Sequence, residues 1–177
     1  MLAEHVRDVA MTAVIFGFFA TTWFGWAQED PPRGWRPFLI AGTVAAVITA
    51  AAGGRIASQH WTATVFDEDT SRTFGIVVGI EFAAAAAGSV VLAVLRRREL
   101  MSAWIAFVVG VHLFPVAAIL GYPFIYVIAV LVTIVSLVGV PIARARNVAP
   151  SAIVGAGSGA SLLVGAIFSA VAAAIIG

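Results

Sequence analysis

The chain consists of six long apolar segments separated by short polar stretches. The segments run from about 9–27, 37–59, 73–95, 101–120, 124–143 and 151–176. Every charged residue except Arg55 and Glu81 falls outside them. A bilayer core about 30 Å thick needs roughly 20 apolar residues per helix, and each segment is about that long. The pattern predicts an all-α polytopic membrane protein, in which residues 1–177 form a single domain with a bundle of six transmembrane helices.

Composition supports this prediction. Hydrophobic residues make up 62% of the 177 positions and charged residues 11%, whereas soluble domains average about 45–50% and roughly 25%. These values exclude soluble, disordered and disulfide-stapled classes of protein. The net charge of +1 does not indicate a basic surface of the kind that binds nucleic acid. Because the chain has no cysteine, it has no thiolate metal site. We expect the lipid bilayer as partner, no nucleic acid, and no cofactor or metal.

The arginines indicate an orientation, since cytoplasmic loops of membrane proteins are enriched in positive charge. The loops after the first, third and fifth segments hold seven arginines, and the opposite side holds three, Arg7, Arg55 and Arg72. The first segment has no plainly basic flank and no signal-peptide cleavage pattern, so we expect it to be retained. The sequence predicts a multi-pass protein of the cell membrane with both termini and the 61–71 loop outside.

Two ionisable residues, Glu81 and His112, lie deep in neighbouring segments. Glu81 stands 15 residues before Arg96 and His112 stands 13 residues after Glu99. At 1.5 Å per residue these positions are roughly 22 and 20 Å from the same membrane edge. A charged group at this depth costs at least about 2.5–3.5 kcal/mol, so each should face the bundle interior and have a partner. We therefore predict that Glu81 and His112 form a polar mid-membrane pair.

The pair has three interpretations. It can be a structural contact that holds two helices together, which is worth roughly 0.6–2 kcal/mol in membrane bundles. It can be a site for a proton, a small ion or a polar solute, because histidine changes its charge near neutral pH. A metal site is the least favoured, because a closed zinc site needs four ligands and only two are in view.

Gly110 and Pro115 flank His112 in the same segment. Proline removes a helical donor and frees the carbonyl oxygen of Val111, so a helix kink is expected beside the histidine. Broken helices often line transport sites. Proline and glycine are nevertheless common in membrane helices without such a role.

A second candidate pair, Asp8 and Arg55, belongs to the outer ends of the first two segments. Arg55 can either pair with Asp8 or extend its head toward the membrane surface. The acidic run Asp67–Asp69 follows in the adjacent loop, where a cation patch or a solvated loop are the alternatives.

Aromatic and small residues add two expectations. Five rings fall near segment ends, where an interfacial belt is the main interpretation and an aromatic ligand cage the minor one; they are Trp26, Trp35, Trp61, Trp104 and Tyr122. Ser151, Gly155 and Gly159 repeat at every fourth position of the last segment. This spacing lets membrane helices approach closely. The packing can lie within one chain or between two, so a homo-oligomer stays open.

The sequence contains no recognisable set of catalytic residues. Ala156–Gly159 differs from the G-x-S-G motif of intramembrane serine proteases by its alanine, and the intramembrane histidine precedes the serine instead of following it. No aspartate pair or histidine cluster of the kind used by intramembrane metalloenzymes is present. We expect a protein that is not an enzyme.

The segment Ile105–Ala117, I-A-F-V-V-G-V-H-L-F-P-V-A, together with Gly75–Phe82, which contains G-I-E, resembles uncharacterised small prokaryotic six-helix membrane proteins. In these, a V-G-x-H-x-x-P helix follows a G-I-E helix. The resemblance implies six spans and the Glu81–His112 pairing, and it implies no activity. Two functions remain: transport or permeation of a small ion, proton or polar solute through this pair, or a non-enzymatic accessory role that binds a lipid, hydrophobic ligand or partner subunit through glycine-rich helix faces.

Overall fold

The computed structural model describes residues 3–177, and within this range it contains helices and no strand. The long helices are α1 (Val6–Ala27), α2 (Arg36–Gln59), α3 (Glu68–Val94), α4 (Met101–Ile119), α5 (Phe124–Ala145) and α6 (Pro150–Ile176), and a short 3₁₀ helix, η1 (Arg98–Leu100), precedes α4. The fold is thus all-α, as predicted. The largest difference is at α3, which begins a turn earlier than expected. There the Asp67 side chain caps the helix by accepting a hydrogen bond from the Thr70 amide at 2.7 Å.

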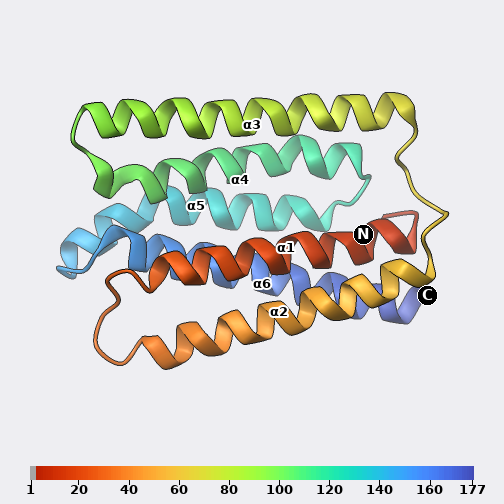
Figure 1. The fold of residues 1–177 in the computed structure, drawn as a ribbon, viewed down its shortest axis with the longest axis horizontal. Helices are drawn as coiled ribbons and strands as arrows, with labels where there is room; N and C mark the ends of the chain where they lie inside the picture. Colours follow the sequence, from red (N-terminus) through yellow and green to blue (C-terminus); the bar gives the residue numbers. More distant parts are fainter. Residues whose placement is uncertain (1–2) are drawn as a thin grey trace.

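The six helices run alternately up and down, which gives the bundle two distinct ends (Figure 1). Both termini, the α2–α3 loop and the α4–α5 turn lie at one end, which we call the termini end. The α1–α2, α3–α4 and α5–α6 connections lie at the other. We call this second end the arginine end, because Arg33 and Arg96–Arg98 lie in its loops.

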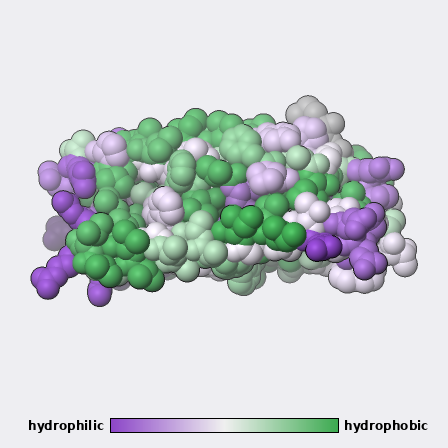
Figure 2. All heavy atoms as spheres, turned by 90° about the horizontal axis from the view of Figure 1, so that it is seen from above, coloured by the Kyte–Doolittle hydropathy of each residue, from purple (hydrophilic) through white to green (hydrophobic). Residues whose placement is uncertain are grey.

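Each of the six helices is long and apolar enough to cross a membrane. Figure 2 shows hydrophobic side chains over the middle of the molecule and hydrophilic side chains gathered at both ends. Large apolar side chains point outward in this middle region; Ile80 is 64% exposed and Ile48 is 63% exposed. In water such a surface would be unfavourable, whereas in a bilayer it contacts lipid. The chain is therefore a multi-pass membrane protein.

Small residues hold the centre of the bundle together. α6 packs against α1, α2 and α5, and α4 packs against α5. A Cβ at Gly155 would lie 2.8 Å from the carbonyl oxygen of Trp23, and one at Gly159 would lie 3.0 Å from the ring of Phe24. The small-residue face of α6 is therefore filled by α1 of the same chain. Ser151 extends this face to the arginine end, where it lines a small cavity with Trp26.

α3 lies at the edge of the bundle. It packs chiefly against α4, and none of its residues is fully buried. Its half-buried positions recur at a spacing of three or four residues, and Val77, Glu81, Ala84 and Gly88 are among them. This spacing forms one stripe along the helix, so Glu81 lies on the face that α3 turns toward α4.

Candidate functional site

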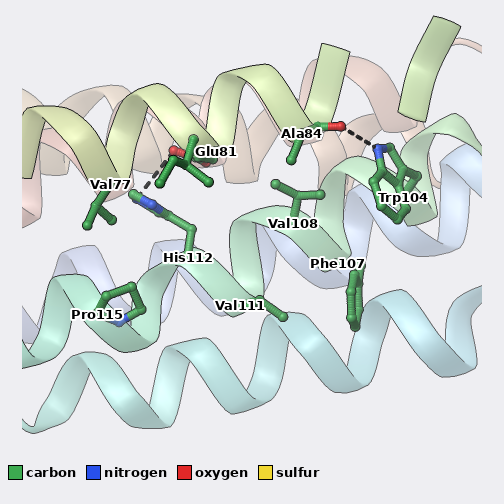
Figure 3. Close-up of a pocket in the computed structure, with 10 residues that line it drawn as sticks. Val77, Glu81, Ala84, Trp104, Phe107, Val108, Val111, His112 and Pro115 are labelled. Atoms are coloured by element: carbon green, nitrogen blue, oxygen red, sulfur yellow. Dashed lines mark hydrogen bonds and ion pairs between the residues drawn. The ribbon is translucent and has the colours of Figure 1, made fainter. Parts of the chain in front are cut away.

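Glu81 and His112 meet between α3 and α4, as their matching depths predict. Oε2 of Glu81 lies 3.3 Å from Nε2 of His112, and their side chains are 17% and 12% exposed. Figure 3 shows the two side chains pointing toward each other across the helix pair. Glu81 stands at the centre of α3, 13 residues from each end. The pair is therefore far from both polar ends of the bundle.

One side of the pair faces a cavity of about 380 Å³ between the two helices, which we call the α3–α4 groove (Figure 3). It is lined by Val77, Ile80, Glu81 and Ala84 of α3 and by Trp104, Phe107, Val108, Val111, His112 and Pro115 of α4. Glu81 and His112 are the only ionisable residues in this lining. All the other lining side chains are apolar or aromatic.

Trp104 closes the groove toward the arginine end. Its indole Nε1 donates a hydrogen bond to the carbonyl oxygen of Ala84 at 3.1 Å. The ring lies directly over Gly88, where any Cβ would overlap it. The sequence predicts an interfacial ring at Trp104 and gives no sign of its contact with α3. A position one helix turn inside α4 is compatible with both.

A second cavity, of about 260 Å³, lies beside α1 and α4 and also includes His112 in its lining. We call it the α1–α4 cavity. Toward the termini end it is bounded by Arg7 and Asp8, and its walls include the rings of Phe16, Phe66 and Phe74. His112 thus lines both cavities.

The second ring nitrogen of His112 has no protein partner. Nδ1 is buried and makes no hydrogen bond within residues 3–177. A buried polar atom without a partner costs free energy, so such atoms are rare in folded proteins. His112 therefore has one nitrogen directed to Glu81 and a second, buried nitrogen without a hydrogen-bond partner.

The two residues expected to kink α4 have different surroundings. Pro115 lines the α3–α4 groove, and α4 continues through it to Ile119. Gly110 contacts Thr133 of α5; a Cβ at this position would lie 2.8 Å from the Thr133 amide nitrogen and closer still to its hydroxyl oxygen. Gly110 therefore allows α4 and α5 to approach closely.

Of the two alternatives for Arg55, the structure does not show the pair with Asp8. The Asp8 carboxylate is only 3% exposed and accepts hydrogen bonds from Oγ1 of Thr64 at 2.7 Å and from the Val65 amide at 2.8 Å. Arg55 is exposed and forms no ion pair within the described residues. The α2–α3 loop folds back over α1 and supplies nearer donors than a long arginine side chain could.

Arg7 completes this attachment of the loop. It donates a hydrogen bond to the carbonyl oxygen of Trp61 at 3.2 Å, and its guanidinium carbon lies 4.2 Å from the centroid of the Trp61 ring. Trp61 is therefore held by a cation–π contact. Tyr122 also departs from the expected belt, since it is fully buried and its hydroxyl lies 3.0 Å from Oγ of Ser169.

The acidic run at the start of α3 forms no metal site. No group of three or more histidine or acidic side chains that could hold a metal ion occurs in residues 3–177. Asp67 instead caps the helix, and its hydrogen bonds with Thr70 lower the pKa of the carboxyl group below its ordinary value.

Comparisons with protein-family models, curated proteins and solved structures each gave no match for the chain. The class of protein defined by the fold is a six-helix membrane protein. Its candidate site is the Glu81–His112 pair, with two cavities that both include His112 in their lining.

Proposed function

We propose that the protein is a membrane transporter that moves a small solute or a proton through the Glu81–His112 site. The observation that carries this proposal is the position of His112. His112 lines both the α3–α4 groove and the α1–α4 cavity, with Nε2 at Glu81 and a buried, unpartnered Nδ1. A group that only joins two helices needs one partner and no second cavity.

Imidazole chemistry explains how such a position can pass a proton. Neutral histidine carries a proton on one nitrogen and a lone pair on the other. When Nε2 accepts the proton of the Glu81 carboxylic acid, Nδ1 can release its own proton to an acceptor on the far side of the ring, and the ring is again neutral. One proton leaves Glu81 and one proton appears on the far side of the ring, so the charge balances. A shuttle of this kind is a common role of histidine.

The α1–α4 cavity extends from His112 toward the termini end, where Arg7 and Asp8 lie. The arginine distribution predicts that this end faces outward. A proton or solute would then reach His112 from outside through the α1–α4 cavity. Passage to the cytoplasm requires a rearrangement, because Trp104 closes the groove toward the arginine end.

Proton flux into vesicles tests this proposal. The purified full chain is reconstituted into liposomes that contain a pH-sensitive dye, and a pH gradient is imposed. We expect a flux above that of protein-free vesicles, which Glu81→Gln and His112→Ala reduce to background. Glu68→Gln is the matched control, since it makes the same chemical change at an exposed position of the same helix. Equal flux through all the proteins would overturn a transport role for the pair.

One observation supports an accessory function as the second candidate. A Cβ at Gly75 or Gly79 would meet nothing within 4 Å, so this face of α3 leaves room for another helix. The glycines of α6 that suggested this function are filled by α1. Background flux from a well-folded parent protein, together with binding of a partner that Gly79→Leu abolishes, would favour the accessory function.

A further inference from the structure

We propose that the α3–α4 groove binds a hydrophobic organic cation, whose positive charge pairs with the Glu81 carboxylate and whose apolar body lies against Trp104 and Phe107. The inference rests on the same site as the proposed transport function and names the class of its substrate. It depends on the chemistry of the groove, which differs from that of a site for a hydrated ion.

The walls of the groove exclude a strongly hydrated solute. Only Glu81 and His112 offer polar side-chain groups free of other partners, because the indole N–H of Trp104 is already bonded to Ala84. An inorganic cation would lose its hydration shell and gain at most two ligands, whereas Mg²⁺ and Ca²⁺ take six or more oxygen ligands. A molecule with an apolar surface has no tightly bound hydration shell to lose when it enters the groove. The groove therefore fits an organic body better than an ion.

Glu81 sets the sign of the charge. No arginine lines the groove, and the one titratable group that faces Glu81 from α4 is His112. Arg7 and Asp8 of α1 line the cavity on the other side of His112. The Glu81 carboxylate therefore has no permanent positive partner in the groove. A cation supplies one, whereas an anion placed there would face a like charge at low dielectric.

Two aromatic rings add to the attraction. The centroids of Trp104 and Phe107 are 6.2 Å apart and the ring planes are inclined by 31°. The indole is fixed in position by its hydrogen bond to Ala84 and by its contact with Gly88. Faces of aromatic rings attract organic cations, and tryptophan does so most strongly. Because Trp104 and His112 are eight residues apart on α4, the groove offers about 12 Å between its charged part and its aromatic end.

A hydrophobic cation can reach the groove from the bilayer. Ile80 and Val111 form part of its edge, and their side chains are 64% and 45% exposed on the lipid-facing surface of the bundle. A cation with a large apolar surface partitions into the membrane, where a hydrated ion does not. The groove is open on the side where such molecules accumulate.

Binding is an exchange of one charge for another. The Glu81 carboxylic acid releases one proton, the carboxylate pairs with the arriving cation, and the groove keeps its net charge. Discharge of the cation on the other side of the membrane takes up one proton again. This exchange needs no redox partner and no cofactor.

Equilibrium binding of tetraphenylphosphonium to the purified full chain in detergent tests the proposal. We expect saturable binding of one cation per chain, which tightens as the pH rises and releases one proton in weakly buffered solution. Glu81→Gln should weaken binding at least about tenfold. Trp104→Leu should weaken it about two- to fivefold, the value of one cation–π contact.

Matched controls separate this site from unspecific uptake by the micelle. Glu68→Gln and Trp35→Leu make the same chemical changes away from the groove and should bind as the parent does. Tetraphenylborate has the same shape with a negative charge and should neither bind nor compete. Thermal unfolding shows which variants are folded, and the borate comparison needs no variant at all.

The outcomes distinguish this inference from the proposed function. Equal binding of the borate and the phosphonium, or unchanged phosphonium binding by folded Glu81→Gln, would overturn the cation site. Cation binding without proton flux in vesicles would support the site and contradict transport. Proton flux that depends on Glu81, without any phosphonium binding, would contradict the substrate class and leave the transport function standing.

Discussion

The carboxylate of Asp8 and the hydroxyl of Thr64 are 2.7 Å apart although 56 positions separate them in the sequence. Together with the bond from the Val65 amide, this contact ties the α2–α3 loop to the first turns of α1. The loop leads directly into α3, which has few other contacts outside α4. Asp8 therefore contributes to the position of the helix that carries Glu81.

Replacement of Asp8 by alanine should loosen this loop. The Thr64 hydroxyl and the Val65 amide would lose their acceptor in a partly buried place, which costs about 1–3 kcal/mol. We expect a lower unfolding temperature in detergent and faster hydrogen exchange at the Val65 amide. Asp30→Ala, at an exposed position, should change neither. Unaltered exchange at Val65 in Asp8→Ala would show that the loop is held by other contacts.

The Glu81–His112 contact should be measurable as a coupling between the two residues. His112→Ala leaves the Glu81 carboxyl group without a partner, and we expect a cost on the order of 1–3 kcal/mol. A double-mutant cycle with Glu81→Ala should give a coupling of roughly 0.6–2 kcal/mol in unfolding free energy. His60→Ala is the control, since the imidazole of His60 makes a hydrogen bond to the Ile56 carbonyl oxygen and none to Glu81. A coupling of zero would mean that the contact contributes nothing to stability.

A methyl group added at Gly155 should disturb the packing of α6 on α1. The new Cβ would lie 2.8 Å from the Trp23 carbonyl oxygen and 2.9 Å from the Cβ of Ala27, so the two helices would have to move apart. We expect Gly155→Ala to lower stability by about 1–3 kcal/mol. Gly79→Ala adds the same group in open space on α3 and should leave stability unchanged or higher. Thermal unfolding of both variants in the same detergent measures this difference in stability.

Acid should weaken the cap of α3. Hydrogen bonds with Thr70 lower the pKa of Asp67 in the folded protein, so its contribution to stability is present above the ordinary pKa of an aspartate. That contribution disappears as the pH falls through the folded value. The protection factor of the Thr70 amide, which compares its exchange rate with the intrinsic rate at the same pH, should therefore fall at low pH in the parent protein. Asp67→Asn should remove this dependence, and an unchanged pH profile in that variant would contradict the cap.

The spans and the central pair could be predicted because both depend on spacing along one helix. Charged residues, or the short turn at Gly121–Pro123, separate the apolar segments. The rise per residue then converts the distance of Glu81 and His112 from the Arg96–Glu99 turn into depth. The pair then follows from the short connection between α3 and α4. Only the face of each helix had to be confirmed by the structure.

The partners of Asp8 and Tyr122 could not be predicted in this way. Thr64 and Val65 lie in a loop without periodicity, so nothing in the sequence places them over α1. Tyr122 stands in a tight turn, where sequence suggests an interfacial ring. Its burial depends on Ser169 of α6 arriving at the same level. Trp104 was ambiguous for the same reason, because its partner Ala84 belongs to another helix.

The orientation of the bundle can be tested with single cysteines, because the natural chain has none. Asp67 lies at the termini end and Arg97 at the arginine end, and both side chains are exposed. The seven-to-three distribution of arginines predicts that the arginine end faces the cytoplasm. Asp67→Cys should therefore react with a membrane-impermeant thiol reagent in intact cells, whereas Arg97→Cys should react only after the membrane is permeabilised. The reverse pattern would invert the bundle, so that the α1–α4 cavity would lead from His112 toward the cytoplasm. The contact between Glu81 and His112 would be the same in either orientation, because it depends only on the relative position of α3 and α4.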